Sequence, residues 1–213
     1  MVILKSNLNY KIMKLKIIFL LTLISNAITA QDSIKMTNNY GSQNKEIQDL
    51  IDFENIYIEQ LNFSSLKLIG KSYKINIEEY KNGILLSTTK LFDGFETDYF
   101  KITTKEETLK FFFRLSDGKL KTYIRGKKFG SKKSYFNLMS DSDQYVLKDF
   151  FGNKEVINLD INSKNTLFAI ITPTIHSDGS GSYCEVVQSD IKPEKLGEQF
   201  NIPHYFLITI TFK

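Results

Sequence analysis

The residues with the clearest chemical potential in this chain are basic and aromatic side chains that alternate along two neighbouring segments. Seven lysines and arginines and no acid lie between Lys119 and Lys133, and both arginines of the chain fall in the same region. Such side chains bind phosphate, sulfate and carboxylate groups, and aromatic rings stack on sugar rings or bases. The sequence therefore predicts an anion-binding surface built from Lys110, Phe112, Arg114, Lys121, Tyr123, Arg125, Lys127 and Lys128.

A β-hairpin is the element that must position these side chains. Asp117 and Gly118 have the residue types of a two-residue hairpin turn. Pairing of Ser116 with Lys119 then brings the apolar residues of both strands to one face, as a correct register requires. This inward set comprises Leu109, Phe111, Phe113, Leu115, Leu120 and Ile124.

The same register places like charges opposite one another on the outward face. Arg114 lies opposite Lys121, and Lys110 lies opposite Arg125. Such pairs are mildly destabilising, and an anionic partner would relieve the repulsion. The alternative is a solvated hairpin whose lysines prevent edge-to-edge aggregation.

The overall charge of the chain does not point to a nucleic-acid-binding protein. The formal net charge is +4, from 28 basic and 24 acidic residues, but residues 1–30 hold four lysines and no acid. The remaining chain has 24 residues of each sign. We therefore expect an anionic glycan, a lipid head group or an acidic protein of the cell envelope as the partner, and no nucleic acid.

Residues 1–30 have the composition of a signal peptide. A basic start is followed by an apolar run, Ile17–Ile24, and by small residues that end at Ala30. The run is too short for a bilayer core, which needs about 20 apolar residues. We expect cleavage after Ala30, with Ala27 as the alternative, no transmembrane span after leader removal, and a periplasmic or secreted protein. An uncleaved N-terminal anchor is the competing interpretation.

A second candidate site is the loop His176–Glu185, which contains the single cysteine, Cys184, and one of the two histidines. Asp178, Ser180 and Ser182 alternate as ligands do in some calcium loops, and a pair of Cys184 with His176 would suit nucleophilic catalysis. A flexible glycine-containing tip is the simpler interpretation. Cys184 on a strand would be a small buried residue.

His204 has the pattern of a structural histidine. It shares its parity with Phe206, Ile208 and Ile210 on a strand expected over residues 204–212. That parity places its ring at the entrance of the core, where a hydrogen-bonded role is expected. A site joining His204 with His176 would require two distant segments to meet.

Other catalytic and cofactor signals are absent from the sequence. There is no glycine-rich phosphate loop, no G-x-S-x-G elbow and no H-E-x-x-H motif. One cysteine excludes an internal disulfide and a multi-cysteine zinc site. The acidic pairs at residues 78–79 and 106–107 would point to opposite faces of a strand. We therefore expect no cofactor and no metal.

The pattern of apolar residues predicts a mainly β protein with one N-terminal amphipathic helix. Residues 31–44 are polar and are expected to form a flexible linker. Asn44 has the type of an N-cap, and helical spacing continues over about 45–62. Within a single domain over 45–213, strands alternate with turns, residues 166–172 suggest a strand covered on both faces, and residues 193–200 suggest a short helix. An antiparallel β-sandwich is the expected fold, with a partly closed barrel as the alternative.

Two segments carry a resemblance to a known group of proteins. Ile28–Gln31, at the end of the leader, and the stretch from Gly181 to Glu185 and on through Asn201–Phe206 resemble uncharacterised exported β-rich proteins of Gram-negative bacteria, grouped as a domain of unknown function. The resemblance covers the leader and about the last fifth of the chain. It implies export and a β-rich fold, and it implies no activity.

Three functions fit these observations. The first is an exported, non-catalytic envelope module that binds an anionic ligand through the hairpin face. The second is a secreted hydrolase that uses the 176–185 loop and His204. The third is a structural subunit that pairs with a partner through an open sheet edge.

The signal peptide gives the first testable prediction. We expect the exported protein to begin at Gln31, because the small residues before it suit the signal peptidase. Mass analysis of the N-terminus of material from the periplasm or culture medium measures this. An intact leader in the soluble periplasmic fraction would contradict the export argument.

Overall fold

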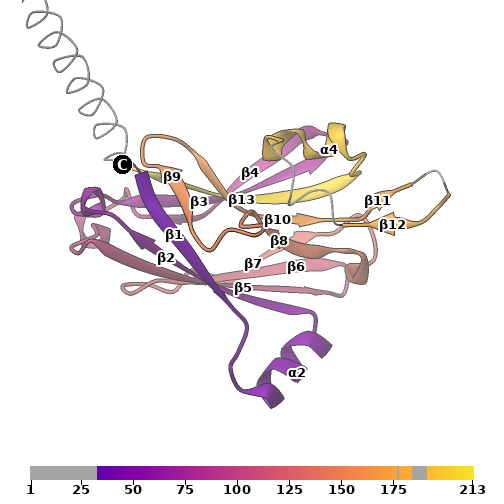
Figure 1. Ribbon diagram of the computed structural model, residues 1–213, viewed down its shortest axis with the longest axis horizontal. Coiled ribbons are helices and arrows are strands. Elements are labelled where there is room, and N and C mark those ends of the chain that lie inside the picture. Colours follow the sequence, from indigo (N-terminus) through magenta and orange to yellow (C-terminus); the bar gives the residue numbers. More distant parts are fainter. Residues whose placement is uncertain (1–32, 177, 184–190) are drawn as a thin grey trace, which may run out of the picture. The chain divides into compact units, whose positions relative to one another are not determined.

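Two antiparallel sheets face each other across a common core in the computed structural model, which describes residues 33–176, 178–183 and 191–213 (Figure 1). The expected signal peptide and Cys184 lie outside the described residues. Contacts group residues 34–213 into one unit. The sheets do not close into a barrel, so the expected β-sandwich is confirmed and the barrel alternative is wrong.

The first sheet has six strands. Their order across the sheet is β7 (Ser134–Asn137), β6 (Lys119–Arg125), β5 (Glu106–Ser116), β2 (Ile56–Ser64), β1 (Ser33–Tyr40) and β9 (Ile157–Asp160). The neighbours from β7 through to β1 pair in antiparallel fashion. This sheet contains the hairpin on which the candidate anion-binding residues lie.

The second sheet has five strands. Their order is β4 (Ile84–Asp93), β3 (Tyr73–Lys81), β13 (His204–Phe212), β10 (Asn165–Ile171) and β8 (Val146–Asp149). A separate two-stranded hairpin joins β11 (Thr174–Ile175) to β12 (Gly181–Ser182). The C-terminal strand β13 therefore lies in the centre of its sheet, as its apolar sequence suggests.

Helical segments are few and short within residues 33–176, 178–183 and 191–213. The α-helices are α2 (Lys45–Phe53) and α4 (Leu196–Gln199), and the 3-10 turns are η1 (Leu66–Leu68), η2 (Asp98–Phe100), η3 (Ser142–Gln144) and η4 (Pro193–Lys195). The short helix expected over 193–200 is thus present as η4 followed by α4. Figure 1 shows α4 on one side of the sandwich and α2 projecting from the other, between β1 and β2.

Aromatic contacts join the inner faces of the two sheets. The rings of Phe111 and Phe168, from opposite sheets, meet edge to face at 5.2 Å, and those of Phe63 and Phe212 do so at 6.0 Å. Such pairs add to the stabilisation from burial. All four side chains belong to the one large hydrophobic cluster between the sheets.

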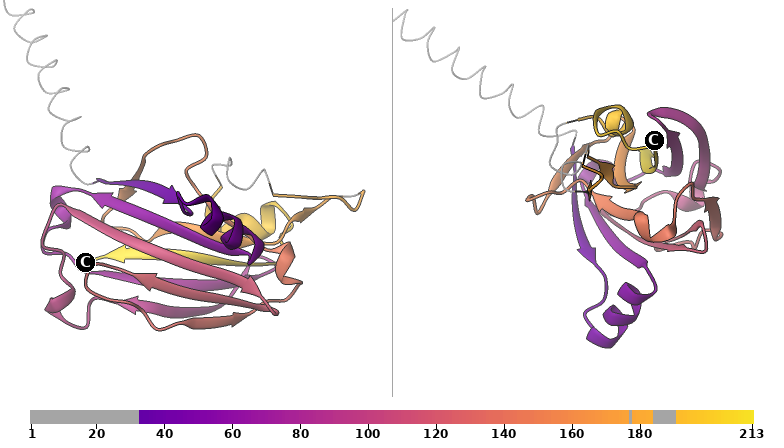
Figure 2. Two further views of the ribbon diagram at one scale, coloured as in Figure 1. Left: turned by 90° about the horizontal axis from the view of Figure 1, so that it is seen from below. Right: turned by 90° about the vertical axis from the view of Figure 1, so that its right-hand side faces the viewer.

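The two sheets differ in how their outer faces are covered. A second cluster packs the outer face of the five-stranded sheet, including Tyr205 and Leu207 of β13, against Leu196 and Phe200 of the α4 region. This explains why β10 and β13 are apolar on both faces. The outer face of the six-stranded sheet has no second hydrophobic cluster among the described residues, and in the view from below only α2 stands in front of its strands (Figure 2).

The β5–β6 hairpin has the register expected from its turn residues. Ser116 pairs with Lys119, and Asp117 and Gly118 both adopt positive φ, as the tight turn requires. Phe111 pairs with Ile124, and both side chains are buried. Alternation along β5 is complete, with buried and half-buried positions succeeding one another from Glu107 to Ser116.

The β3–β4 hairpin shows how bulges correct a register that its turn alone would set wrongly. Asn82 and Gly83 form a two-residue turn that, if continued regularly, would place Ile75 opposite Lys90. Register shifts occur after Glu79 and again after Ile75, so Ile75 meets Phe92 instead. Bulges of this kind insert an extra residue and return apolar side chains to the core.

Two expectations for the N-terminal region are wrong. Residues 33–40 are not a linker but strand β1, whose Ile34 and Met36 are buried in the core. The helix, capped by the side chain of Asn44 as expected, ends at Phe53 and not near residue 62. Asn55 takes a φ of 50°, which stops the helix and turns the chain into β2.

The burial pattern of β5 gives a stability prediction. Phe111→Ala should lower the free energy of unfolding by about 3–5 kcal/mol, since it leaves a cavity at a fully buried position. Phe112→Ala, on the neighbouring half-buried position, should cost much less. Urea denaturation of both variants measures the difference, and equal losses would mean that the faces of β5 are assigned wrongly.

Candidate functional site

Six of the eight candidate anion-binding residues lie together on the outer face of the six-stranded sheet. Arg114 pairs with Lys121, Phe112 with Tyr123, and Lys110 with Arg125, so all six side chains leave the same side of the β5–β6 hairpin. Their positions alternate with buried ones along both strands. We call this set, Lys110, Phe112, Arg114, Lys121, Tyr123 and Arg125, the basic face.

The cations and the rings of the basic face are interleaved. The rings of Phe112 and Tyr123 lie 5.6 Å apart at an angle of 42°. The ammonium of Lys110 lies 5.7 Å from the centre of the Phe112 ring. Arg125 Nη2 donates a hydrogen bond of 3.3 Å to the hydroxyl of Tyr123. An anion on this face would therefore meet positive charge and a ring surface together.

Lys127 and Lys128 do not extend the basic face, contrary to the sequence expectation. The chain folds back after β6, where Arg125 forms a bridge with Gly130. This turn directs both ammonium groups to backbone carbonyls of another segment. Lys127 Nζ donates to the carbonyl of Glu106 at 3.1 Å, and Lys128 Nζ donates to those of Tyr99 and Lys101 at 3.0 and 2.7 Å.

The basic face is hollowed at one end. A cavity of about 270 Å³ is lined by Ile56, Phe112, Phe113, Arg114, Lys121, Tyr123 and Lys133. Its floor is apolar, and three cations and a phenol stand around it. Sequence reasoning missed Ile56, because residue 56 was expected on a helix. It counted Lys133 in the basic run but could not place it at the site, because its position depends on the loop after β6.

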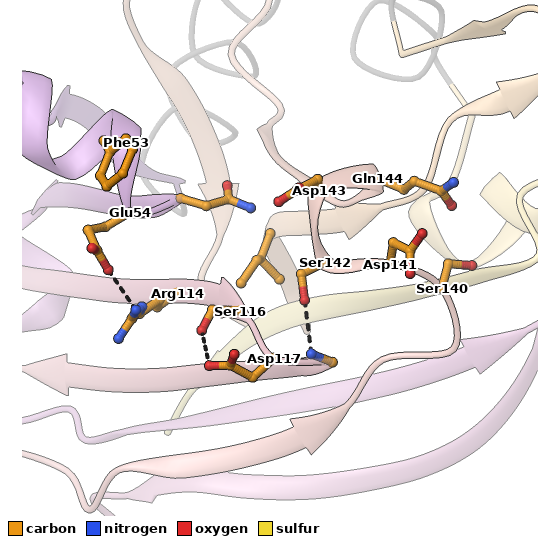
Figure 3. A pocket seen from close by; sticks show the side chains of 13 residues that line it. Phe53, Glu54, Arg114, Ser116, Asp117, Ser140, Asp141, Ser142, Asp143 and Gln144 are labelled. Atoms are coloured by element: carbon orange, nitrogen blue, oxygen red, sulfur yellow. Dashed lines mark hydrogen bonds and ion pairs between the residues drawn. The ribbon is translucent and has the colours of Figure 1, made fainter.

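Arg114 connects the basic face with a second, larger cavity. Its Nη2 donates to Glu54 Oε2 at 2.6 Å, and Glu54 is the C-cap residue that directly follows α2 (Figure 3). The side chains are 43% and 35% exposed. This ion pair was not expected from the sequence, since Glu54 was placed within a longer helix.

The larger cavity has an acidic lining. It encloses about 680 Å³ between the end of α2, the β5–β6 turn and the η3 segment, and Glu54, Asp117, Asp141 and Asp143 line it. Ser142 Oγ accepts a hydrogen bond from the Gly118 N–H, which joins η3 to the turn (Figure 3). Across the described part of the chain, no group of three or more histidine, cysteine or acidic residues is arranged to hold a metal ion.

The described part of the second candidate loop is held by its own short hydrogen bonds. His176 Nε2 and Ser182 Oγ lie 2.9 Å apart, and Asp178 Oδ1 accepts from both the N–H and the hydroxyl of Ser180. The hydroxyls of the calcium-like pattern therefore already have partners. Cys184 lies outside the described residues, so a pair with His176 stays a prediction.

His204 is buried and hydrogen-bonded, as expected of a structural histidine. Its side chain is 1% exposed, and burial lowers its pKa. Tyr145 accepts a hydrogen bond from the Met139 N–H and donates its own proton to His204 Nδ1, while Nε2 donates to Glu79 Oε1 at 3.2 Å. The neutral ring thus ties three segments together and does not reach solvent as a general base would.

The acidic pairs point to opposite faces, as their spacing predicts. Glu79 faces His204, whereas Glu78 lies on the outer face and accepts two hydrogen bonds from Lys164. Glu106 is exposed and Glu107 is buried. Burial raises the pKa of Glu107, which accepts a hydrogen bond from the hydroxyl of Tyr73.

Glu59 is the most perturbed carboxyl among the described residues. It lies on the inward face of β2, is 4% exposed, and has one oxygen without a hydrogen-bond partner. Burial, with a smaller contribution from Asp149, raises its pKa to about 8. The carboxyl is therefore largely protonated at neutral pH, which reduces the cost of burying it.

A long exposed sheet edge bears on the possibility of strand pairing. β4 spans ten residues at the edge of its sheet, and Ile84, Leu85 and Leu86 are 68%, 49% and 50% exposed. The two register shifts and the exposed Lys90 are features that hinder pairing with another strand. The first residues of β4 are therefore apolar and exposed, whereas the remainder of the strand carries features that oppose pairing with a strand of another molecule.

Comparisons of the chain with protein-family models, with curated proteins and with solved structures gave no match. Among the described residues, no helix has both the length and the apolar character needed to cross a membrane. The site must therefore be interpreted from its own geometry.

Glu59 gives a pH-dependent stability prediction. A pKa raised from 4.5 to about 8 means that the folded state holds a proton that the unfolded state has released. The stability that the protonated Glu59 carboxyl contributes is fully present below pH 4.5. It is lost progressively as the pH rises from 4.5 through about 8, and the free energy of unfolding falls by at most about 1.4 kcal/mol per pH unit.

Urea denaturation between pH 6 and pH 9 measures this effect. The stability of Glu59→Gln should fall less over this range than that of the unmodified protein. Glu106→Gln, which changes an exposed acid on the adjacent strand, should leave the slope unchanged. Parallel profiles for all three proteins would show that Glu59 ionises normally.

Proposed function

We propose that this protein is an exported, non-catalytic binding module of the cell envelope whose ligand is an anionic glycan. The basic face is the binding surface in this proposal. Export rests on the leader-like composition of residues 1–30, and a periplasmic or secreted location follows from it. The resemblance to exported proteins of Gram-negative bacteria agrees with this assignment.

A single observation carries the proposal. Four cations and two aromatic rings stand on one open sheet face, and Arg114, Lys121 and both rings also line a cavity of about 270 Å³. Outward positions of β5 from Thr108 to Ser116 and of β6 from Lys119 to Arg125 include no carboxylate, whereas Glu106 and Asp117 stand at the two ends of β5. A glycan suits this face better than a simple ion does, because sugar rings would stack on Phe112 and Tyr123 while acidic groups meet the cations.

The competing functions receive less support. A hydrolase would need His204 at a surface, whereas its ring is buried and bonded at both nitrogens. A subunit joined through a sheet edge would use β4, whose bulges and lysine oppose regular pairing. The glycan-binding module is therefore the function that we put forward for testing.

The proposal predicts salt-sensitive binding that depends on both arginines. Heparin, which is sulfated, and polygalacturonate, which is carboxylated, are suitable probes, with dextran as the neutral comparison. Binding should weaken as salt rises, because it displaces counterions from the polyanion. Arg114→Ala with Arg125→Ala should weaken it about 2- to 30-fold, since surface charge pairs contribute about 0.2–1 kcal/mol each.

A matched control removes the same charge elsewhere. Lys154 and Lys192 are exposed and lie outside the β5–β6 hairpin, so Lys154→Ala with Lys192→Ala should change affinity much less. Thermal unfolding checks that both double variants fold. Equal losses in the two double variants, or stronger binding to phosphatidylglycerol vesicles than to either glycan, would contradict the proposal.

A further inference from the structure

The cavity on the basic face has the composition of a site for one ring that carries one anionic group. Ile56 and Phe112 make an apolar surface, and Tyr123 adds a second ring inclined to that of Phe112. A volume of about 270 Å³ equals that of roughly nine water molecules in the liquid, which is enough for one sugar unit. The cavity is thus sized for a residue of a chain and not for the whole chain.

The three cations around this cavity differ in whether a carboxylate of the protein already neutralises them. Lys121 lies with its ammonium 5.8 Å from the centre of the Tyr135 ring. Neither Lys121 nor Lys133 forms an ion pair within the part of the chain that the structure describes. Arg114 is different, because one end of its guanidinium is already held by the carboxylate of Glu54.

The Glu54–Arg114 pair joins a well-anchored strand to a lightly held helix. The backbone next to Glu54 is fixed, since the carbonyl of Asn55 accepts from the N–H of Leu115 at 3.1 Å. Helix α2 itself buries Ile51, but Ile47, Leu50 and Phe53 are 50%, 60% and 85% exposed. The side chain of Glu54 can therefore leave Arg114 without disturbing the core.

We propose that this cavity binds one acidic sugar unit and that Glu54 competes with its anionic group for Arg114. The inference rests on the proposed glycan-binding function and adds a subsite and a residue that sets its affinity. In the free protein, Glu54 occupies the guanidinium. In the complex, the carboxylate or sulfate of the sugar takes that position, its ring lies against Phe112, and Glu54 turns to solvent.

The ligand must break the Glu54–Arg114 ion pair before it can bind Arg114. The free energy of that ion pair is therefore subtracted from the free energy of ligand binding. The pair is only partly buried and its worth is correspondingly small, so Glu54→Gln should bind the ligand roughly two- to fivefold more tightly. The same exchange should raise selectivity for charged over neutral glycans. Phe112→Leu should weaken ligand binding, because it removes the aromatic ring on which the sugar lies.

The experiment measures the affinities of an oligogalacturonate and a heparin oligosaccharide by calorimetry, with maltotetraose as the neutral probe. Asp117→Asn is the matched control for charge, because Asp117 lies at the same end of the hairpin and bonds to Ser116 instead of Arg114. Tyr40→Leu is the control for the ring, because Tyr40 is an exposed ring of β1 that does not line the cavity. Thermal unfolding verifies folding of each variant.

A double-mutant cycle separates competition from a general charge effect. In the Arg114→Gln background, the gain from Glu54→Gln should disappear, since there is no guanidinium left to compete for. A gain that persists in that background, or an equal gain from Asp117→Asn, would overturn the inference. The relative affinities of the carboxylated and sulfated probes identify which anion the site prefers.

The two proposals fail in different ways. If the unmodified protein binds a polyanion in a salt-sensitive manner but Glu54→Gln binds no more tightly, only the competition and its subsite are refuted. If neither glycan binds to the unmodified protein or to any variant at low salt, the proposed function is refuted as well.

Discussion

The alternation of side chains along β5 is the constraint on which the remainder of this structure depends. Phe111 and Phe113 must point inward, because both pack edge to face on Phe168 of the opposite sheet, at 5.2 and 5.7 Å. A strand has a period of two, so burial of these rings fixes the outward direction of Lys110, Phe112 and Arg114. The core thus determines the composition of the surface, and a shift of one residue would bury three of the six residues of the basic face.

Unequal covering of the two sheets then decides which face is available to a ligand. The five-stranded sheet is central to the protein, with the six-stranded sheet on one side and the η4–α4 segment on the other. Its buried polar groups are satisfied internally, as Lys164 satisfies Glu78 and as Tyr145 and Glu79 satisfy His204. The six-stranded sheet has one packed face and one open face, and the open face carries the interleaved cations and rings.

Local signals in the sequence were sufficient to predict the parts of the fold in which local and tertiary preferences agree. The β5–β6 register follows from Asp117 and Gly118 together with the apolar alternation, and β13 follows from its own alternation. Both the sandwich class and the inward position of His204 could be inferred in this way.

The N-terminal region could not be predicted because its pattern fits more than one structure. Tyr57, Ile58 and Leu61 satisfy helical spacing, yet they form a strand, because Asn55 at positive φ ends the helix and β2 pairs with both β1 and β5. Residues 33–40 contain few apolar side chains, and it is pairing with β2 and β9 that makes them a strand. Which strands pair depends on residues that are distant in the sequence, so a local pattern cannot predict it.

The candidate site shows the same division between local and tertiary information. The six residues of the basic face could be predicted, since one hairpin presents them all. Glu54, Ile56 and Lys133 could not, because they reach the face from α2, from β2 and from the segment before β7. Lys127 and Lys128 were included on sequence proximity alone, and the turn after Arg125 directs them to backbone carbonyls instead.

The missed residues also explain how the free protein tolerates a face with like charges in opposing positions. Arg114 and Lys121 pair across the hairpin, and their repulsion is reduced by Glu54 on one side and by the ring of Tyr135 on the other. The repulsion between Lys110 and Arg125 is reduced in a similar way. The Lys110 ammonium lies over the Phe112 ring, and Arg125 donates a hydrogen bond to the Tyr123 hydroxyl. Each cation is therefore compensated by a weak contact at the surface, which is partly buried for Arg114 and Glu54, and an external anion can replace it at little cost. A surface stabilised by strong buried pairs would be equally stable but would have no cation to offer, so the weakness of these contacts is what suits the basic face to binding.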